Sequence, residues 1–267
     1  MDDLTTTRAM IIDLDGVLWL GDTPLPGLHE FFALLRRRQI RFILVSNNAT
    51  TTAQTVQAKL RRMGVEVGPE EILTSSAATA VYLRDLFPPG ARIYVVGEAP
   101  LKEALTSIGF LLADRAENVQ AVIGSLDRQV TYQMLTEASL AIRAGALFLG
   151  TNGDVTYPTE RGLAPGSGAL LAALQAASGR TPTIVGKPEP YVYAQALARL
   201  GASPEDTLAL GDRLETDILG GQRAGLKAAI VLTGVTRRED LENSPIRPDW
   251  VFEGLPDVCR ALDGVSR

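Results

Sequence analysis

Short apolar runs alternate with stretches of helical periodicity along almost the whole chain, and this alternation limits the folds open to it. A run such as residues 8–13 is too short for a helix and ends in polar residues, which is typical of a buried strand. The runs of this kind are RAMIID (8–13), RFILVS (41–46), RIYVVG (92–97), VQAVIGS (119–125), ALFLGT (146–151), PTIVG (182–186), TLALG (207–211) and KAAIVLT (227–233). Helical patterns such as residues 28–38 and 51–63 lie between most of them. The alternation predicts an α/β protein with largely parallel sheets.

The length and the order of these segments predict two domains. The chain has 267 residues, and at ~150 residues per domain this allows roughly two. The stretch between Ser46 and Lys187 is too long for one crossover and contains strands and helices of its own. We therefore predict a core of residues 1–77 and 180–267, interrupted by an inserted α/β domain of residues 78–179.

Composition excludes several classes of function. The formal net charge is −5 and the pI is near 5.1, which gives no electrostatic support to a nucleic-acid or anionic-membrane partner. A single cysteine, Cys259, and a single histidine, His29, exclude an intrachain disulfide and Cys-rich or multi-His metal sites. No apolar run approaches the ~20 residues of a membrane span, and the first residues lack a signal-peptide pattern. We therefore expect a cytoplasmic protein.

Polar side chains follow several of the predicted strands, at the edge where open parallel sheets bind ligands. Asp13 and Asp15 come directly after the first strand, and Gly16 permits a tight turn there. Two carboxylates this close would repel each other unless a cation lay beside them, and Lys187 or a divalent metal could supply that charge. The alternative is a turn in which the aspartates accept hydrogen bonds from backbone amides.

A second and a third strand end carry groups that suit phosphate. Ser46, Asn47 and Asn48 follow RFILV, and a hydroxyl with free amides at a helix start can hold a phosphate. The same residues could instead cap the helix predicted over 51–63. Lys187 is one of only four lysines among 26 basic residues. It could contact phosphate as a compact charge, or it could be an ordinary exposed lysine.

The strand TLALG is followed by two further carboxylates. Asp212 ends the strand, and Asp217 lies about one helical turn later. Mg²⁺ favours sites with one or two carboxylates, water and phosphate oxygens. The alternative is that these acids cap the next helix. The strand ends together therefore predict a hard-cation site beside a phosphate site, with the structural alternatives still open.

The four strand-end segments taken together resemble the motif set of the haloacid dehalogenase-like (HAD) superfamily. The matching segments are DLDGVL (13–18), LVSNNAT (44–50), VGKPEP (185–190) and LGDRLETDI (210–218). Residues 121–180 resemble the large α/β cap of the NagD-like branch, which includes p-nitrophenyl phosphatases, phosphoglycolate phosphatases and pyridoxal phosphate phosphatases. The resemblance covers the whole chain and implies a Rossmann-like, doubly wound parallel sheet with an inserted cap.

The resemblance also implies a mechanism, that of an Mg²⁺-dependent phosphatase acting on small phosphorylated metabolites. Asp13 would be the nucleophile that forms an aspartyl phosphate, and Asp15 would protonate the leaving alkoxide and then activate water. Ser46, the Asn47 amide and Lys187 would hold the phosphoryl oxygens. The whole set expected to bind phosphate or substrate is Gly16, Ser46, Asn47, Asn48, Lys187 and Tyr157.

The charges of this implied site call for a metal ion. Asp13, Asp212 and a phosphate monoester outweigh Lys187 by about three negative charges, and one Mg²⁺ offsets most of that excess. The implied ligands are the Asp13 carboxylate, the Asp15 carbonyl oxygen and Asp212. Asp217 would not bind the metal directly but would orient water molecules or Lys187.

Competing functions remain open at this point. A phosphotransferase or phosphomutase could use the same core, and a non-catalytic protein could bind phosphorylated ligands with it. The presence of Asp15 favours a phosphatase over the halide-releasing members of the superfamily, whose leaving group needs no proton. The segment ending at Tyr157 is expected to contact the substrate, although Tyr157 could equally be a core residue. Phosphoglycolate, glycerol phosphate, nucleotides and sugar phosphates all remain possible substrates, and the branch implies a possible homodimer through the cap.

Overall fold

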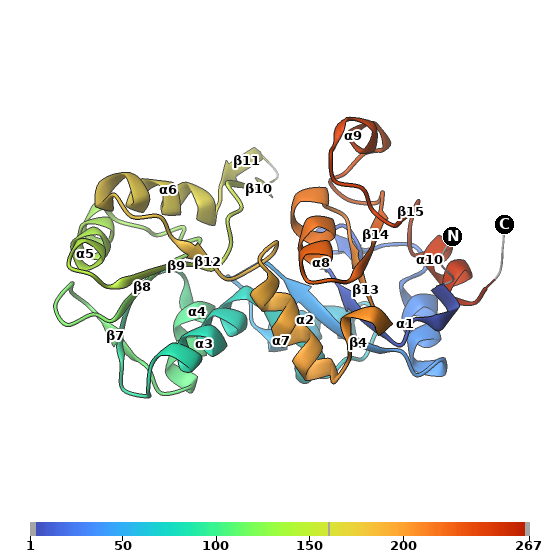
Figure 1. Cartoon of the computed structure of the whole chain (residues 1–267), viewed down its shortest axis with the longest axis horizontal. Helices are drawn as coiled ribbons and strands as arrows, with labels where there is room; N and C mark the ends of the chain where they lie inside the picture. Colours follow the sequence, from blue (N-terminus) through green and yellow to red (C-terminus); the bar gives the residue numbers. More distant parts are fainter. Residues whose placement is uncertain (1–3, 160, 265–267) are drawn as a thin grey trace. The chain divides into compact units, whose positions relative to one another are not determined.

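The computed structural model describes residues 4–159 and 161–264, which belong to two compact units (Figure 1). The first unit comprises the chain up to Ser46, Ala53–Leu73 and the chain from Lys187 onward, and the second comprises Asn47–Thr52 and Thr74–Gly186. These limits differ from the predicted insert of residues 78–179. Helix α3 (Ser75–Leu86) starts at its cap Thr74 and is not divided, and strand β12 (Thr183–Ile184) pairs with β9 (Leu147–Gly150) of the second unit.

The first unit is built on a six-stranded sheet in the order β15-β14-β13-β1-β4-β5. The neighbouring pairs from β15 through β4 are parallel. Its strands are β1 (Ala9–Ile12), β4 (Arg41–Ser46), β5 (Ile72–Thr74), β13 (Thr207–Gly211), β14 (Lys227–Val231) and β15 (Trp250–Phe252). All residues of β1 and β13 are buried, as expected for strands covered on both faces. The strand order reverses at β1, where a doubly wound sheet opens its ligand site.

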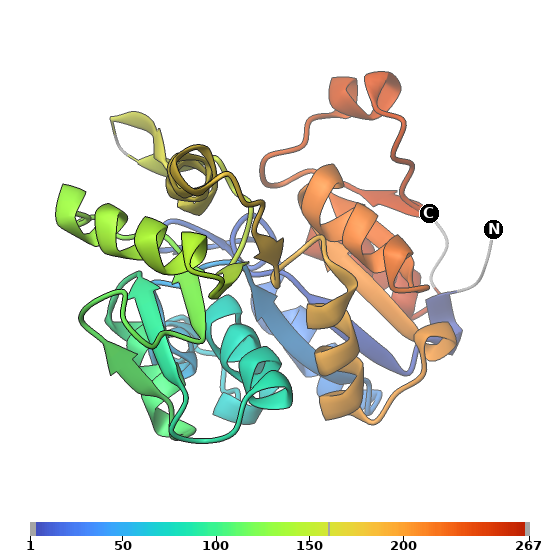
Figure 2. The same cartoon turned by 60° about the vertical axis from the view of Figure 1, so that its left-hand side comes forward.

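Helices cover both faces of this sheet. Met10 and Ile12 share an apolar cluster with side chains of α1 (Leu28–Arg37), α2 (Ala53–Arg62) and α10 (Leu255–Leu262). The other face contacts α7 (Pro190–Leu200), which lies on β1 and β4, and α8 (Leu219–Arg223), which lies on β14. Figure 2 shows these helices from a second side. The predicted doubly wound α/β core is confirmed.

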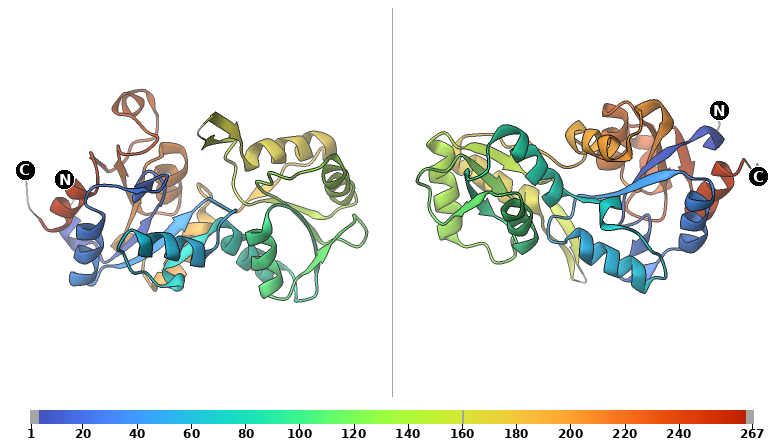
Figure 3. Two further views of the ribbon diagram at one scale, coloured as in Figure 1. Left: turned by 180° about the vertical axis from the view of Figure 1, so that it is seen from behind. Right: turned by 90° about the horizontal axis from the view of Figure 1, so that it is seen from below.

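The second unit is also a three-layer α/β structure (Figure 3). Its five-stranded parallel sheet has the order β12-β9-β8-β6-β7, with β6 (Arg92–Val96), β7 (Leu111–Ala113) and β8 (Ala121–Gly124). One face packs on α3 and α4 (Ala99–Ser107), and the other packs on α5 (Tyr132–Arg143) and α6 (Ser167–Ser178). A two-stranded antiparallel sheet, β10 (Thr156–Thr159) with β11 (Gly162–Pro165), joins β9 to α6. This is the α/β insert expected from the sequence.

One strand differs in its placement from the prediction. The run PTIVG was counted among the strand ends of the core, but its strand β12 joins the sheet of the second unit. The short elements not predicted from the sequence include β5, β7 and β15 and the hairpin of β2 (Trp19–Leu20) and β3 (Thr23–Pro24). The remaining short elements are η1 (Leu4–Thr6), η2 (Pro69–Glu71), η3 (Pro204–Asp206), η4 (Leu214–Ile218) and α9 (Arg238–Asn243). Among the helices of residues 4–159 and 161–264, none is long and apolar enough to cross a membrane.

Candidate active site

The parallel register of the central strands places their last side chains at one edge of the sheet. Ile12 of β1 is paired with Leu44 of β4 and with Leu210 of β13. Asp13 follows β1 directly, and its backbone N–H donates to the Leu210 carbonyl over 2.9 Å. The ends of β4 and β13, which carry Ser46 and Asp212, therefore lie on either side of Asp13.

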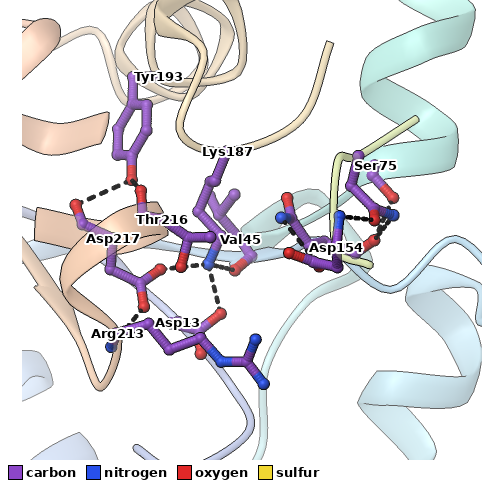
Figure 4. A network of polar contacts seen from close by, with 11 residues as sticks. Asp13, Val45, Ser75, Asp154, Lys187, Tyr193, Arg213, Thr216 and Asp217 are labelled. Carbon is purple, nitrogen blue, oxygen red and sulfur yellow. Dashed lines mark hydrogen bonds and ion pairs between the residues drawn. The ribbon is translucent and has the colours of Figure 1, made fainter. Parts of the chain in front are cut away.

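Lys187 is the buried cation of this edge (Figure 4). Its Nζ lies 2.5 Å from Asp13 Oδ1, 2.6 Å from Asp217 Oδ1 and 3.3 Å from the Val45 carbonyl oxygen. Only 3% of the residue is exposed, which rules out an ordinary surface lysine. Burial alone would lower the pKa of Lys187, but the Asp13 and Asp217 carboxylates raise it well above its usual range. Lys187 therefore stays a cation at neutral pH.

Asp217 uses both of its carboxylate oxygens within the protein. Oδ1 pairs with Lys187, and Oδ2 accepts the backbone N–H of Arg213 over 3.1 Å. The turn η4 that carries Asp217 is held by the Tyr193 hydroxyl, which donates to the carbonyl oxygens of Thr216 at 3.2 Å and Asp217 at 3.1 Å. This arrangement suits Asp217 to orienting Lys187.

Asp212 is held by the loop that follows β14. Its Oδ2 accepts the backbone N–H of Val235 over 2.6 Å. A Cβ atom on Gly16 or on Gly234 would overlap the Asp212 carboxylate, so both positions require glycine, and Gly16 also has a positive φ of 84°. Gly16, predicted in the phosphate-binding set, thus leaves room for Asp212. Burial and the nearby Asp217 raise the pKa of Asp212 to about 6.

The carboxylates of this site fit a divalent cation. Asp13, Asp212 and Asp217 each offer an oxygen, and these atoms all lie within 4.8 Å of one another. Lys187 offsets only one of the three negative charges, and burial with the neighbouring acids raises the pKa of Asp13 well above its usual range despite Lys187. Asp212 Oδ1 is buried and has no hydrogen-bond partner in the described part of the chain. Such an oxygen suits Mg²⁺, which Asp13 and Asp212 could hold.

Asp15 and Ser46 complete the predicted residues of the first unit. The Asp15 side chain is exposed, and its Oδ1 accepts a hydrogen bond from Trp19 Nε1 over 2.8 Å. Ser46 is buried at the last position of β4. Asp15 therefore lies three positions beyond β1 and two beyond Asp13, and Ser46 follows Val45, whose carbonyl oxygen contacts Lys187.

The other predicted binding residues, Asn47, Asn48 and Tyr157, belong to the second unit. The Asn47 carbonyl oxygen accepts from Ser75 Oγ at 2.7 Å and from Asn152 Nδ2 at 2.8 Å. Asn48 Oδ1 accepts both the backbone N–H and the hydroxyl of Thr50, each over 2.8 Å, which is a local turn and not the helix cap considered as the alternative. Tyr157 is half-buried in β10.

Three residues of the site were not predicted from the sequence: Trp19, Tyr193 and Val235. The segment TGV (233–235) follows a strand that pairs with β13, so the sequence could have marked it as a candidate region, but its residues do not predict the backbone hydrogen bond from Val235 to Asp212. Trp19 and Tyr193 carry no comparable signal, since an aromatic residue in an apolar segment is normally a core residue.

The chain matches two sequence families. Residues 10–111 match the family described as haloacid dehalogenase-like hydrolase, and residues 184–258 match a HAD-hydrolase-like family. The acid sugar phosphatase of Staphylococcus aureus is 38% identical over 256 residues, covering 96% of this chain and 98% of the relative.

Solved structures agree with these matches. NagD from E. coli K-12 superposes with a TM-score of 0.86 at 35% identity and covers 93% of this chain and 97% of its own. A glycerol phosphate phosphatase from Mycobacterium tuberculosis, solved in complex with magnesium, gives a TM-score of 0.89 at 36% identity, with 98% of this chain and 78% of that chain covered. The chain therefore belongs to the haloacid dehalogenase-like hydrolases. Within that family it is a phosphatase of the NagD-like branch.

Proposed function

We propose that this phosphatase hydrolyses small phosphate monoesters with Mg²⁺, through an acyl phosphate formed on the Asp13 carboxylate. The observation that carries the proposal is the buried Asp13–Lys187–Asp217 ion-pair chain beside the unpartnered Oδ1 of Asp212. A buried excess of carboxylates is costly unless a cation completes it. Mg²⁺ would supply the positive charge that such a site lacks, and a phosphate ester would supply the phosphorus atom that Asp13 attacks.

In the first step an Asp13 oxygen attacks phosphorus as the bond to the leaving oxygen breaks. Lys187 holds Asp13 by Oδ1 and neutralises charge on the phosphoryl oxygens. Asp15 gives its proton to the leaving oxygen. Mg²⁺ bound by Asp13, the Asp15 carbonyl oxygen and Asp212 would supply electrophilic stabilisation of the transferring phosphoryl group.

In the second step water attacks phosphorus and releases Asp13. Asp15, now a carboxylate, accepts the proton of that water, so that each turnover restores both aspartates. Ser46, the last residue of β4, would donate its hydroxyl to a phosphoryl oxygen. Asp217 keeps Lys187 in position through both steps, because its second oxygen is fixed by the Arg213 amide.

We propose phosphorylated sugars and polyols as the substrate class. The support comes from two relatives, an acid sugar phosphatase and a glycerol phosphate phosphatase, which align with nearly all of this chain. Steady-state hydrolysis of glucose 6-phosphate, glycerol 3-phosphate, phosphoglycolate and a nucleoside monophosphate would rank these classes by kcat/KM. A preference for the nucleotide or for phosphoglycolate would contradict the proposed class.

The hydrolytic chemistry has its own test. With Mg²⁺ and p-nitrophenyl phosphate we expect equal amounts of phosphate and nitrophenol. Acid quenching should trap an acyl phosphate in the wild type and none in Asp13→Asn. A phosphorylated product formed from added glycerol, in place of free phosphate, would indicate a phosphotransferase. Ligand binding without turnover would indicate a binding protein. Dimerisation through the second unit remains a prediction, which light scattering would test.

A further inference from the structure

The carboxylate of Asp15 is fixed by a neighbour that the mechanism above does not use. The indole Nε1 of Trp19 donates a hydrogen bond of 2.8 Å to Asp15 Oδ1. The two residues also form a backbone bridge, and the Gly16 N–H donates to the Trp19 carbonyl oxygen over 2.8 Å. An exposed aspartate on a turn normally samples several rotamers. Here one oxygen is held by a donor on the same turn.

Trp19 is itself held rigidly. Only 2% of it is exposed, and it belongs to the apolar cluster of the first unit. The ammonium of Lys59 lies 4.5 Å from the centre of the indole ring. The same ammonium donates to the Gly21 carbonyl oxygen over 2.6 Å and lies 3.6 Å from Asp22. Lys59 of helix α2 thus contacts both the face of the Trp19 ring and the turn of the β2–β3 hairpin, and it stabilises the position of the ring.

We infer that Trp19 is a positioning residue that makes Asp15 Oδ2 the proton-carrying oxygen. The inference rests on the proposed function, in which Asp15 is the acid and the base. An indole N–H can only donate, so Oδ1 must act as an acceptor toward it. The acidic proton of Asp15 is therefore assigned to Oδ2, the oxygen that Trp19 does not hold.

The proton balance of both steps follows from this assignment. When the leaving oxygen departs, it takes the proton from Oδ2, and Asp15 becomes a carboxylate whose Oδ1 still accepts the Trp19 N–H. When water attacks the phosphorylated Asp13, its proton returns to Oδ2. The Trp19 hydrogen bond is kept throughout, so Asp15 does not need to rotate between its two tasks.

The test measures how the loss of this hydrogen bond depends on the leaving group. The probes are 2,4-dinitrophenyl, p-nitrophenyl and phenyl phosphate, three aryl esters whose leaving groups need a proton increasingly in that order. The parameter is kcat/KM, which reports the step that breaks the ester bond. For Trp19→Phe we expect a roughly 10- to 100-fold loss on phenyl phosphate, part of the ~10²–10⁴ that a general acid contributes. We expect a loss below about threefold on the dinitrophenyl ester.

Two variants serve as controls for this experiment. Trp250→Phe removes the other tryptophan, which packs against the same apolar cluster, and should leave the three rates in their wild-type ratio. Replacing Trp19 by benzothienylalanine removes only the N–H and keeps the shape of the ring, so it gives the same test if Trp19→Phe does not fold. It should reproduce the graded loss with an unchanged melting temperature.

Asp15→Asn separates this inference from the proposed function. A graded loss in Asp15→Asn and in both Trp19 variants supports the inference. A graded loss in Asp15→Asn with an equal loss on all three esters in the Trp19 variants overturns the inference and leaves the proposed function intact. Equal losses on all esters in Asp15→Asn itself overturn the acid role of Asp15, and the inference with it.

Discussion

Replacing Lys187 by methionine should be among the most damaging changes in the first unit, even with no substrate present. Methionine keeps the length of the side chain and removes the charge that pairs with Asp13 at 2.5 Å and Asp217 at 2.6 Å. The variant therefore leaves two adjacent carboxylates buried without their cation, and Asp212 lies close to both.

The expected loss follows from the burial of the pair. Removing one partner of a buried ion pair costs about 3–5 kcal/mol, because the remaining charge is left uncompensated. In a domain of this size each kcal/mol corresponds to roughly 2–4 °C in Tm. We therefore expect Lys187→Met to lower the Tm by roughly 6–20 °C at pH 7.5 in EDTA.

The measurement is calorimetry in EDTA at pH 7.5 and at pH 5.5, with Lys227→Met as the matched control. Lys227 pairs with Asp249 at 3.2 Å but has a half-exposed side chain, so its loss should cost at most about 1 kcal/mol. Lower pH should restore part of the stability of Lys187→Met, because burial raises the pKa of Asp13 and Asp212, and these carboxylates then bind protons that the unfolded chain does not hold. A Tm within about 3 °C of the wild type at pH 7.5 would refute this reasoning.

Three further predictions concern chemistry, metal and selectivity. Asp13→Asn should keep the wild-type Tm within a few degrees and retain less than about a hundredth of the wild-type kcat. The loss of a single proton-transfer group typically lowers the rate ~10²–10⁴-fold, so a residual rate above a hundredth of the wild type would count against covalent catalysis by Asp13. EDTA should abolish activity, Mg²⁺ should restore it, and Ca²⁺ should bind without restoring it, because Ca²⁺ prefers a larger oxygen shell. The rise in Tm on adding Mg²⁺ should shrink as the pH falls through about 6, because the Asp212 carboxylate then takes up a proton that competes with the metal. A rise in Tm that stays constant between pH 7.5 and 5 would contradict the role of Asp212 as a metal ligand. Tyr157→Ala should reorder substrates by kcat/KM, at roughly tenfold per 1.4 kcal/mol of lost contact; an equal fall on all substrates together with a lower Tm identifies Tyr157 as a structural residue.

The sequence predicted the layered α/β fold well because parallel strands buried on both faces must be apolar along their whole length. The runs at 8–13 and 207–211 show this directly, and their strands β1 and β13 are completely buried. The sequence could not predict which sheet a short strand joins. The run at 182–186 is a short apolar run like the core strands, and the pairing of Thr183 with Leu149 and of Ile184 with Gly150 assigns it to the second unit.

The residues of the candidate site likewise fall into those that the sequence predicts and those that it does not. The charged groups could be predicted, because a carboxylate or a lysine directly after a buried strand has few structural reasons to be there. The groups that hold them could not, because the hydrogen bonds from Tyr193 to residue 216 and from Val235 to Asp212 each join positions more than twenty residues apart. Every residue except proline has a backbone N–H, so the amino-acid sequence does not indicate which of these groups will donate to a buried carboxylate.

The choice of lysine at position 187 follows from the chemistry of the two basic side chains. The arginines of the first unit often act on backbone carbonyls: Arg38 donates to Leu262 and Thr5 near the ends of α10 and η1, and Arg41 donates to Leu200 and Gly201 at the end of α7. A planar guanidinium with five donors suits such clusters of acceptors. Between Asp13 and Asp217 the acceptors instead converge on one point, where a compact ammonium fits and a wider fork would displace a carboxylate. Lys187→Arg should therefore fail to restore the activity lost in Lys187→Met although it restores the charge, and recovery of more than about a tenth of kcat would show that charge alone suffices.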